Sequence, residues 1–195
     1  QEKLKFLATT DYLSSLYNRS EFMNLAQREF ALVKSNNEDL SLLVMDLDNF
    51  KIINDTFGHA AGDEVIREMG RIIKTSFRKT DIAGRIGGEE FAVVLKNASL
   101  EEAKKVAEKF RETIARRKVI YEEKEIGFTV SIGVAAIHGI TDEINGIEDI
   151  LKIADNAMYK AKANGRNCVT TFEFGIEDVT PLEIKNCERT YRTES

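Results

Sequence analysis

The chain has 195 residues, 43% of them hydrophobic, and it carries a formal net charge of −5. This composition is typical of one well-packed domain, and it excludes a disordered chain and, because no apolar run is long enough, a membrane span within these residues. The acidic balance also argues against a nucleic-acid partner, which requires a basic face.

The start of the chain and its cysteines indicate the setting in which it works. It begins at Gln1 rather than at methionine, and no apolar stretch with a cleavage site follows, so we expect an excised piece of a longer protein without a signal peptide. Cys168 and Cys187 make neither a disulfide framework nor a metal cluster. We therefore expect a cytoplasmic location, either for the whole protein or as the cytoplasmic part of a membrane-bound sensor.

Hydrophobic periodicity divides the chain into alternating helices and strands. In chain order the predicted elements are a helical lead-in (1–10), a turn (11–19), a helix (21–34), a buried strand (40–45), a helical turn (50–54), a glycine-rich loop (58–63), a helix (65–77), a hairpin (82–86 and 91–95), a helix (100–117), a charged loop or irregular strand (121–126), a strand (128–135), a helix (147–161), a strand (167–172) and a tail (174–195).

Several boundaries have their own signals. Ser99 and Glu102 match a capping box, and Gly165 is predicted to end a helix in the left-handed conformation. The strand over 128–135 alternates large apolar residues with small ones such as Gly133, so another element can approach its second face closely.

This order of elements predicts an α/β sandwich. Its core follows the ferredoxin-like plan β-α-β-β-α-β, in which helices flank a central, mainly antiparallel sheet. Residues 11–173 form a single domain on this reading, residues 1–10 precede it as the end of a linker, and residues 174–195 are a tail.

Two acidic clusters are predicted to meet in this fold. Asp46 and Asp48 follow the first buried strand, and Glu89 and Glu90 lie at the tip of the hairpin, after Gly87-Gly88. Converging carboxylates suit a hard divalent cation such as Mg²⁺, and such sites serve phosphoryl or nucleotidyl transfer. The alternatives are a helix-start signal for the aspartates and a solvated turn for the glutamates.

The hairpin tip Gly87-Gly88-Glu89-Glu90-Phe91 resembles the signature of the GGDEF family, in its Glu-Glu variant. The resemblance covers about Thr10 to Phe172 and does not depend on these five residues alone. Further blocks match in family order: Asp11-x-Leu13 with Asn18-Arg19, Asp46-x-Asp48-x-Phe50-Lys51-x-x-Asn54-Asp55, Gly58-His59-x-x-Gly62-Asp63, Arg85-x-Gly87, Ser131-Ile132-Gly133-Val134-Ala135, and Ala154-Asp155-x-Ala157-Met158-Tyr159-x-Ala161-Lys162-x-x-Gly165-Arg166-Asn167.

The resemblance implies a diguanylate cyclase with a palm-like variant of the ferredoxin plan. Such an enzyme condenses two GTP molecules into cyclic di-GMP and releases two pyrophosphates. One site holds one GTP, so a homodimer is expected for catalysis, with an upstream sensor or regulatory domain in the full-length chain. Ser14-Ser15 replaces the family's usual Thr-Gly and is a mild departure in the turn before the domain.

The resemblance also implies roles for the acidic clusters. Asp46, Glu89 and the Leu47 carbonyl hold Mg²⁺, for which Mn²⁺ can substitute, and Glu90 is a further carboxylate beside the metal. Glu89 is the expected general base for the attacking 3′-hydroxyl, and Lys51 supplies a cation to the reaction.

Other matching positions are implied to bind the nucleotide. Asn54 and Asp63 read the guanine edge, and His59 lies beside the substrate. The remaining implied contacts come from Gly87, Gly88, Lys162 and Arg166. Without the resemblance, these residues read as helix caps, loop residues and helix-terminal charges.

A regulatory site is implied by Arg78-x-x-Asp81, which precedes the hairpin at the family's spacing for an inhibitory product site. Arginine suits it because the guanidinium binds phosphate in a bidentate manner and stacks on guanine. Arg111, on the following helix, resembles the secondary arginine of that site. The alternative is a helix-terminal arginine followed by a turn aspartate.

Three other functions remain open at this point. The domain could bind GTP or cyclic di-GMP without turnover, could make a mixed guanine–adenine dinucleotide, or could be a generic nucleotidyl transferase of the palm type. The intact hairpin tip argues against the first and Asp63 against the second, while Arg78 and Asp81 distinguish the chain from the third.

Overall fold

A five-stranded sheet with strand order β2-β3-β1-β6-β7 lies at the centre of the computed structural model, which describes residues 8–36, 38–138 and 144–174. The described elements are, in chain order, α2 (Arg19–Asn36), β1 (Asp39–Leu47), α3 (Phe50–Phe57), α4 (His59–Ser76), β2 (Ile82–Arg85), β3 (Glu90–Lys96), α5 (Leu100–Ala115), β4 (Lys118–Tyr121), β5 (Lys124–Gly127), β6 (Val130–His138), α6 (Ile147–Ala163) and β7 (Val169–Phe174).

Strand β1 is the middle of the sheet and has antiparallel neighbours on both sides. It pairs with β3 from Leu40↔Lys96 to Asp46↔Glu90, and with β6 as far as Leu47↔Val130. Strand β7 adds to β6 in the parallel direction. The order and directions confirm the predicted ferredoxin-like plan with a mainly antiparallel sheet.

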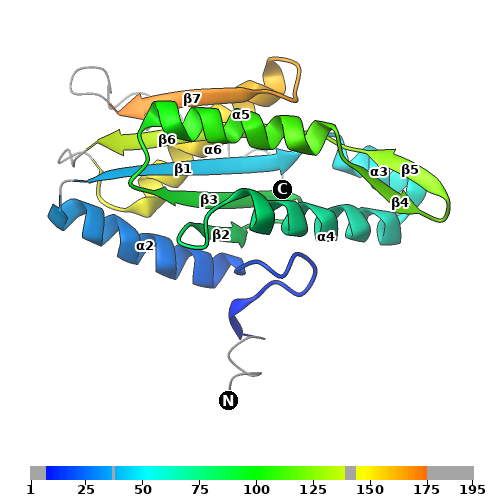
Figure 1. Ribbon diagram of the computed structural model, residues 1–195, viewed down its shortest axis with the longest axis horizontal. Coiled ribbons are helices and arrows are strands. Elements are labelled where there is room, and N and C mark those ends of the chain that lie inside the picture. Colours follow the sequence, from blue (N-terminus) through cyan, green and yellow to red (C-terminus); the bar gives the residue numbers. More distant parts are fainter. Residues whose placement is uncertain (1–7, 37, 139–143, 175–195) are drawn as a thin grey trace, which may run out of the picture.

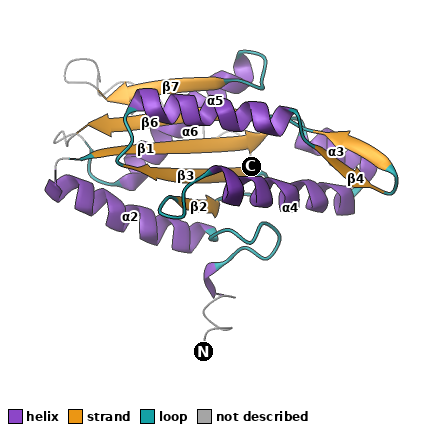
Figure 2. Ribbon diagram, in the orientation of Figure 1, coloured by secondary structure: helices purple, strands orange, loops and turns teal. Residues whose placement is uncertain are grey.

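Helices cover both faces of the sheet. Figure 1 shows α4 and α5 in front of the strands and α6 behind them, and Figure 2 shows the same layers by secondary structure. Leu43 and Met45 of β1 belong to the hydrophobic cluster on the α4–α5 side, whereas Leu42 and Val44 belong to the cluster on the side of α2 and α6. Burial on both faces explains why β1 has a nearly continuous apolar sequence.

Helix α6 packs very closely on β6, at the small-residue face that the sequence predicted. A Cβ atom on Gly133 would lie 1.9 Å from the carbonyl oxygen of Ala154 and 2.2 Å from the amide nitrogen of Met158. Backbone atoms cannot move aside as a flexible side chain can, so only glycine fits here.

One predicted segment differs from the structure, and another, predicted as a loop or an irregular strand, takes a definite form. Residues 58–63 were predicted as a loop, but only Gly58, at φ +88°, interrupts the chain, and α4 begins at His59. Gly62 is inside that helix because α3 packs against it. The charged segment 121–126 forms a tight hairpin between β4 and β5, with Glu122 and Glu123 both at positive φ.

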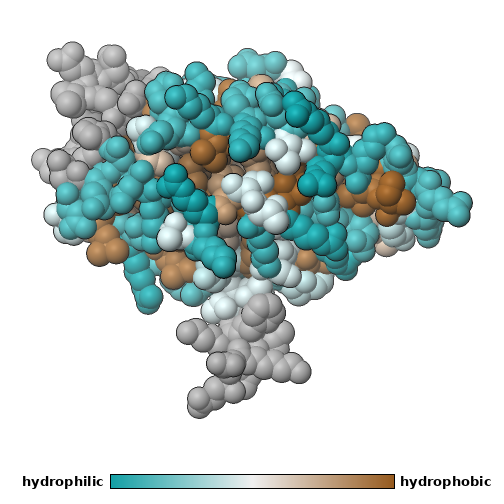
Figure 3. Space-filling view, in the orientation of Figure 1, coloured by the Kyte–Doolittle hydropathy of each residue, from teal (hydrophilic) through white to brown (hydrophobic). Residues whose placement is uncertain are grey.

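The surface in Figure 3 is largely hydrophilic, with small apolar patches, one of them at the end occupied by the β4–β5 hairpin. Ile120 of this hairpin is 64% exposed. None of the described helices combines the length and apolar composition needed to cross a bilayer. Residues 1–7 of the predicted lead-in (1–10) and residues 175–195 of the predicted tail (174–195) lie outside the described residues.

Gly133→Ala is expected to destabilise the domain, because the added methyl group must push α6 away from β6. Overpacking of a core costs roughly 1–3 kcal/mol, and urea unfolding would measure the loss. Gly127→Ala is the matched control, since a Cβ there meets nothing within 4 Å. Equal stability of the two variants would contradict the close-packing argument.

Candidate active site

Two acidic residues face each other at the end of the central strand. Asp46, only 5% exposed, pairs across the sheet with Glu90, and the Leu47 amide donates to the Glu89 carbonyl at 3.2 Å. The predicted meeting of the first strand with the hairpin tip is therefore confirmed. Like charges directly opposite in a sheet destabilise it unless a cation lies between or near them.

A lysine lies beside the more deeply buried carboxylate. Lys162 Nζ is 2.6 Å from Asp46 Oδ1, an ion pair that leaves this oxygen without a well-directed hydrogen bond in the described chain. Burial raises the pKa of Asp46 to about 6, although Lys162 opposes the rise; the charges of Glu89 and Glu90 add to it. The site thus favours an additional positive charge.

Glu90 has a similar electrostatic environment. Burial raises the pKa of its carboxyl, and the charge of Asp155 on α6 adds to the rise, whereas Lys162 and Arg19 oppose it. Among the described residues, the carboxylates near Glu90 are thus opposed mainly by Lys162 and Arg19.

These groups fit a magnesium ion that is held partly by a ligand. Mg²⁺ in nucleotide enzymes is usually bound by one or two carboxylates, with substrate phosphates and water completing its shell. Asp46, Glu89 and the Leu47 carbonyl offer such a set. Among the described residues no group of three or more His, Cys, Asp or Glu side chains is placed to hold a metal alone.

The turn before Glu89 is fixed by two arginines that sequence reasoning gave no role. Arg85 donates to the Gly88 carbonyl at 2.6 and 3.0 Å and to the Asp11 carboxylate at 3.1 and 3.2 Å. Arg19 donates to the Ile86 carbonyl at 3.0 Å. Both arginines belong to quoted sequence blocks, but nothing in the pattern showed that they bind backbone carbonyls.

Asp11 ties the N-terminal turn to the same place. Burial acts to raise the pKa of Asp11, but hydrogen bonds from Ser14 and the Arg85 guanidinium lower it overall. Ser14 donates through both its amide (2.8 Å) and its hydroxyl (2.7 Å). The Ser14 departure therefore keeps the contact with Asp11.

The residues predicted to read guanine come from two successive helices. Asn54 lies on α3 and Asp63 on the first turns of α4, where both are half-buried. A Cβ on Gly62 would fall 1.9 Å from Asn54 Oδ1, so the Asn54 amide lies directly against α4 next to Asp63. Lys51 and His59 are exposed on α3 and α4.

Arg166 follows α6 in an exposed turn, four residues beyond Lys162. Its φ of 65° is left-handed, as is that of Asn167 at 45°. Lys162 is thus brought to the acidic cluster directly, whereas Arg166 is placed at the adjoining end of α6.

Arg78 and Asp81 form one compact turn. The Arg78 amide donates to Asp81 Oδ2 at 2.9 Å, and the Asp81 amide donates to the Arg78 carbonyl at 3.0 Å. Both line a groove of about 880 Å³ that Arg28 and Lys74 also border. A ligand with phosphate groups would find several cations there.

Arg111 does not join this turn within the described chain. Glu102, near the start of α5, shares a small cavity with Arg78 and Asp81, but Arg111 lies about 13 Å further along the helix, at 1.5 Å per residue. Its guanidinium binds Glu108 at 2.8 Å and Asn167 at 3.0 Å instead.

Comparison with known proteins agrees with this geometry. Residues 8–168 match the family model described as "Diguanylate cyclase, GGDEF domain". The chain therefore belongs to the GGDEF family of diguanylate cyclase domains, as its sequence motifs indicated. Its fold is the α+β, palm-like fold of that family.

Particular relatives are similar over most of this chain. It is 41% identical over 167 residues to diguanylate cyclase A of Treponema denticola, covering 84% of this chain and 44% of the relative. It is 38% identical to a diguanylate cyclase of Vibrio cholerae, covering 86% of this chain and 50% of that protein. The chain thus spans about half the length of the curated relatives it matches.

Solved structures share the architecture. The GGDEF domain of DgcB from Caulobacter crescentus, in complex with c-di-GMP, matches with a TM-score of 0.79 and 33% identity, covering 84% of this chain and 93% of that one. The active GGEEF domain of a Vibrio cholerae diguanylate cyclase matches with a TM-score of 0.73 and 34% identity, covering 81% and 98%.

Asp46→Asn is expected to change how stability depends on pH. Because the pKa of Asp46 is raised from 3.8 to about 6 in the folded chain, the folded state holds a proton that the unfolded state releases. The free energy of unfolding of the wild type should therefore fall as pH rises from about 4 to about 6, whereas asparagine does not titrate. The free energy of unfolding of Asp46→Asn minus that of the wild type should rise over this pH range and then level off. Urea unfolding without divalent cations would measure both free energies.

Magnesium provides the control for this measurement. At about pH 7 a saturating concentration of Mg²⁺ should raise the free energy of unfolding of the wild type more than that of Asp46→Asn. An ion that binds only the folded state stabilises that state, and the variant lacks the Asp46 carboxylate that would bind it. A pH-independent difference between the two proteins would contradict the assigned environment of Asp46.

Proposed function

We propose that this chain is the catalytic domain of a diguanylate cyclase, which condenses two GTP molecules into cyclic di-GMP and releases two pyrophosphates. The observation that carries the proposal is the pairing of buried Asp46 with the Gly87–Glu90 turn at the end of β1. The names of the relatives and the c-di-GMP complex of the DgcB domain support it.

Asp46, Glu89 and the Leu47 carbonyl would hold Mg²⁺, or Mn²⁺ in its place. When bound, the metal neutralises phosphate charge and lowers the pKa of a coordinated hydroxyl. Glu89 then accepts the proton of the attacking 3′-hydroxyl. Glu90 would be a further carboxylate beside the metal; because burial raises the pKa of its carboxyl, a cation bound nearby would favour its ionised form.

Basic side chains near the acidic cluster would bind the phosphates of GTP. Lys162 pairs with Asp46 in the ligand-free chain and lies where the phosphates of a nucleotide would approach the acidic cluster. Arg166 and Lys51 add charge from α6's end and from α3. A net charge of −5 makes such local cations necessary for an anionic substrate.

Guanine is selected by Asn54 and Asp63. A carboxylate accepts hydrogen bonds from the two N–H donors on the Watson–Crick edge of guanine, whereas adenine has no such donor pair. A site built for these bonds rejects a base that leaves its polar groups unpaired. This favours cyclic di-GMP over a mixed guanine–adenine product.

The reaction needs two nucleotides facing each other, and each domain supplies one half-site. We therefore propose a homodimer that forms during turnover, with an upstream sensor or regulatory domain controlling it in the full-length protein. No nucleic acid takes part.

Incubation with GTP and Mg²⁺ should yield cyclic di-GMP, measured by chromatography at high protein concentration. Glu89→Ala should lower the rate roughly 10²-fold or more, because the general base and a metal carboxylate are both lost. Glu68→Ala, which removes an acid paired with exposed Arg71 on α4, is the control. A wild type that binds GTP but gives no product would favour the binding-module alternative, and an active Glu89→Ala would refute the role of this residue.

Product inhibition is expected to depend on the Arg78–Asp81 turn. Adding cyclic di-GMP should slow the wild type, and Arg78→Ala should remove most of this slowing because the guanidinium that binds phosphate is gone. The measured quantity is the ratio of rates with and without added product. Lys124→Ala, on the exposed β4–β5 hairpin, should keep the wild-type ratio; an unchanged ratio in Arg78→Ala would rule the site out.

A further inference from the structure

The turn between α6 and β7 holds three consecutive residues in the left-handed region. Gly165 has φ +106°, Arg166 65° and Asn167 45°. A left-handed residue other than glycine costs on the order of 1 kcal/mol, and such residues persist only where their surroundings hold them. The arginine assigned to the phosphates thus has a strained backbone whose supports can be identified.

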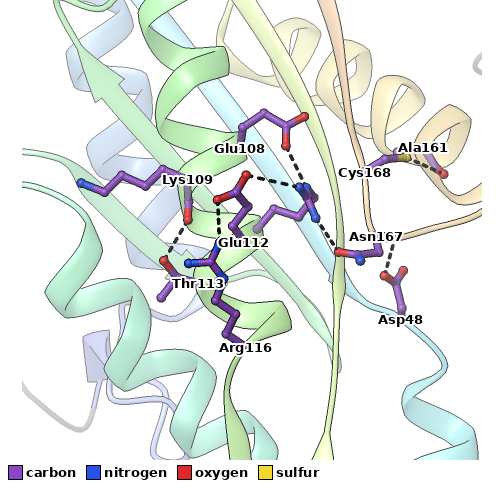
Figure 4. Close-up of polar contacts among 10 residues, drawn as sticks. Asp48, Glu108, Lys109, Glu112, Thr113, Arg116, Ala161, Asn167 and Cys168 are labelled. Atoms are coloured by element: carbon purple, nitrogen blue, oxygen red, sulfur yellow. Dashed lines mark hydrogen bonds and ion pairs between the residues drawn. The ribbon is translucent and has the colours of Figure 1, made fainter.

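The peptide groups on both sides of Arg166 are held. Its own amide donates to the Ala161 carbonyl at 3.1 Å, which anchors it to the end of α6. The next amide, of Asn167, donates to Asp48 Oδ2 at 2.9 Å, as Figure 4 shows. Rotation of the backbone at Arg166 would break one of these bonds.

Asp48 connects this turn to the end of β1. It is 4% exposed and accepts hydrogen bonds from the hydroxyls of Thr129 at 2.7 Å and Ser131 at 2.6 Å, besides the Asn167 amide. Its own amide donates to the Thr129 carbonyl at 2.9 Å. A carboxylate with three donors is strongly fixed, so the proposed metal strand and the phosphate turn share one rigid support.

Arg111 holds the same turn from the side of α5. Its Nε donates to Glu108 at 2.8 Å and Nη1 donates to Asn167 Oδ1 at 3.0 Å. Only 19% of its side chain is exposed, and Glu112 lies 4.0 Å from the guanidinium. The two acids orient the guanidinium toward Asn167, which is drawn in Figure 4 between Asp48 and the α5 residues.

We propose that Asp48 and Arg111 are positioning residues for substrate: by holding Asn167 through its amide and its side chain, they fix Arg166 where it meets the triphosphate of GTP. The proposal rests on the proposed function and names the groups that prepare one part of its site. It also gives Arg111 a role in substrate binding rather than in the inhibitory product site.

Arg111→Gln tests this role, with Arg116→Gln as the matched control. Arg116 directly follows α5, its side chain is 80% exposed, and it pairs only with Glu112 among the described residues. Loss of the hydrogen bond to Asn167 should weaken binding of a non-hydrolysable GTP analogue roughly three- to tenfold, the range of an ordinary net hydrogen bond. Calorimetry with Mg²⁺ would measure it, and the KM for GTP should rise similarly with kcat little changed. Guanosine, which has no phosphate, should bind all three proteins equally.

Further variants separate positioning from general damage. Asn167→Gly suits the left-handed backbone but removes the hydrogen-bond acceptor for Arg111. It should therefore lower the affinity for the GTP analogue as much as Arg111→Gln does, and the double variant should bind the analogue little more weakly than either single variant. Arg111→Lys should restore part of the affinity. The proposal would be overturned if the two substitutions lowered the affinity for the analogue additively, or if they lowered the affinity for guanosine as much as that for the analogue.

The product site provides the opposing outcome. If Arg111→Gln binds the analogue as well as Arg116→Gln does and only relieves inhibition by cyclic di-GMP, Arg111 belongs to the inhibitory site and the proposal is wrong. Because the analogue titration needs no turnover, it decides this point even if the wild type makes no cyclic di-GMP, an outcome that would refute the proposed function alone.

Discussion

The structure depends on one unfavourable interaction, the burial of the Asp46 carboxylate opposite Glu90 at the end of the central strand. A buried charge is tolerated only with a partner, and here Lys162 supplies it from α6. The close contact of α6 with β6 at Gly133 brings that helix near enough for its lysine to reach the strand end. The close packing of α6 on β6 therefore also positions the lysine that compensates the buried charge of Asp46.

The site is built from segments that are rigid for different reasons. The hairpin tip is held by arginine bonds to carbonyls, whereas the Asn54 amide is held by contact with the α4 backbone at Gly62. The turn at Arg166 is held by a buried carboxylate. Preorganised groups lose little entropy when a ligand binds, so each of these supports would contribute to the proposed recognition of a nucleotide without touching it.

Sequence reasoning recovered the elements and the convergence of Asp46 with the hairpin, because periodicity and strand adjacency are local or topological properties. It failed where contacts between distant elements determine whether a segment is a helix or a loop. Two glycines in 58–63 suggested a loop, but Gly62 is explained by packing between α3 and α4, which no single-sequence pattern reveals. The contact of Arg111 with Asn167 was not predicted for a similar reason: the two residues are far apart in the sequence and meet only in the folded chain.

The position of β1 also has a consequence for folding. Both of its neighbours are remote in the chain, since Asp46 pairs with Glu90 on one side and Ser131 on the other. Pairings at such separations form late and cooperatively, because loop-closure entropy must first be overcome. The acidic site therefore exists only in chains whose two halves have joined, and its ligands report on the whole domain rather than on a local segment.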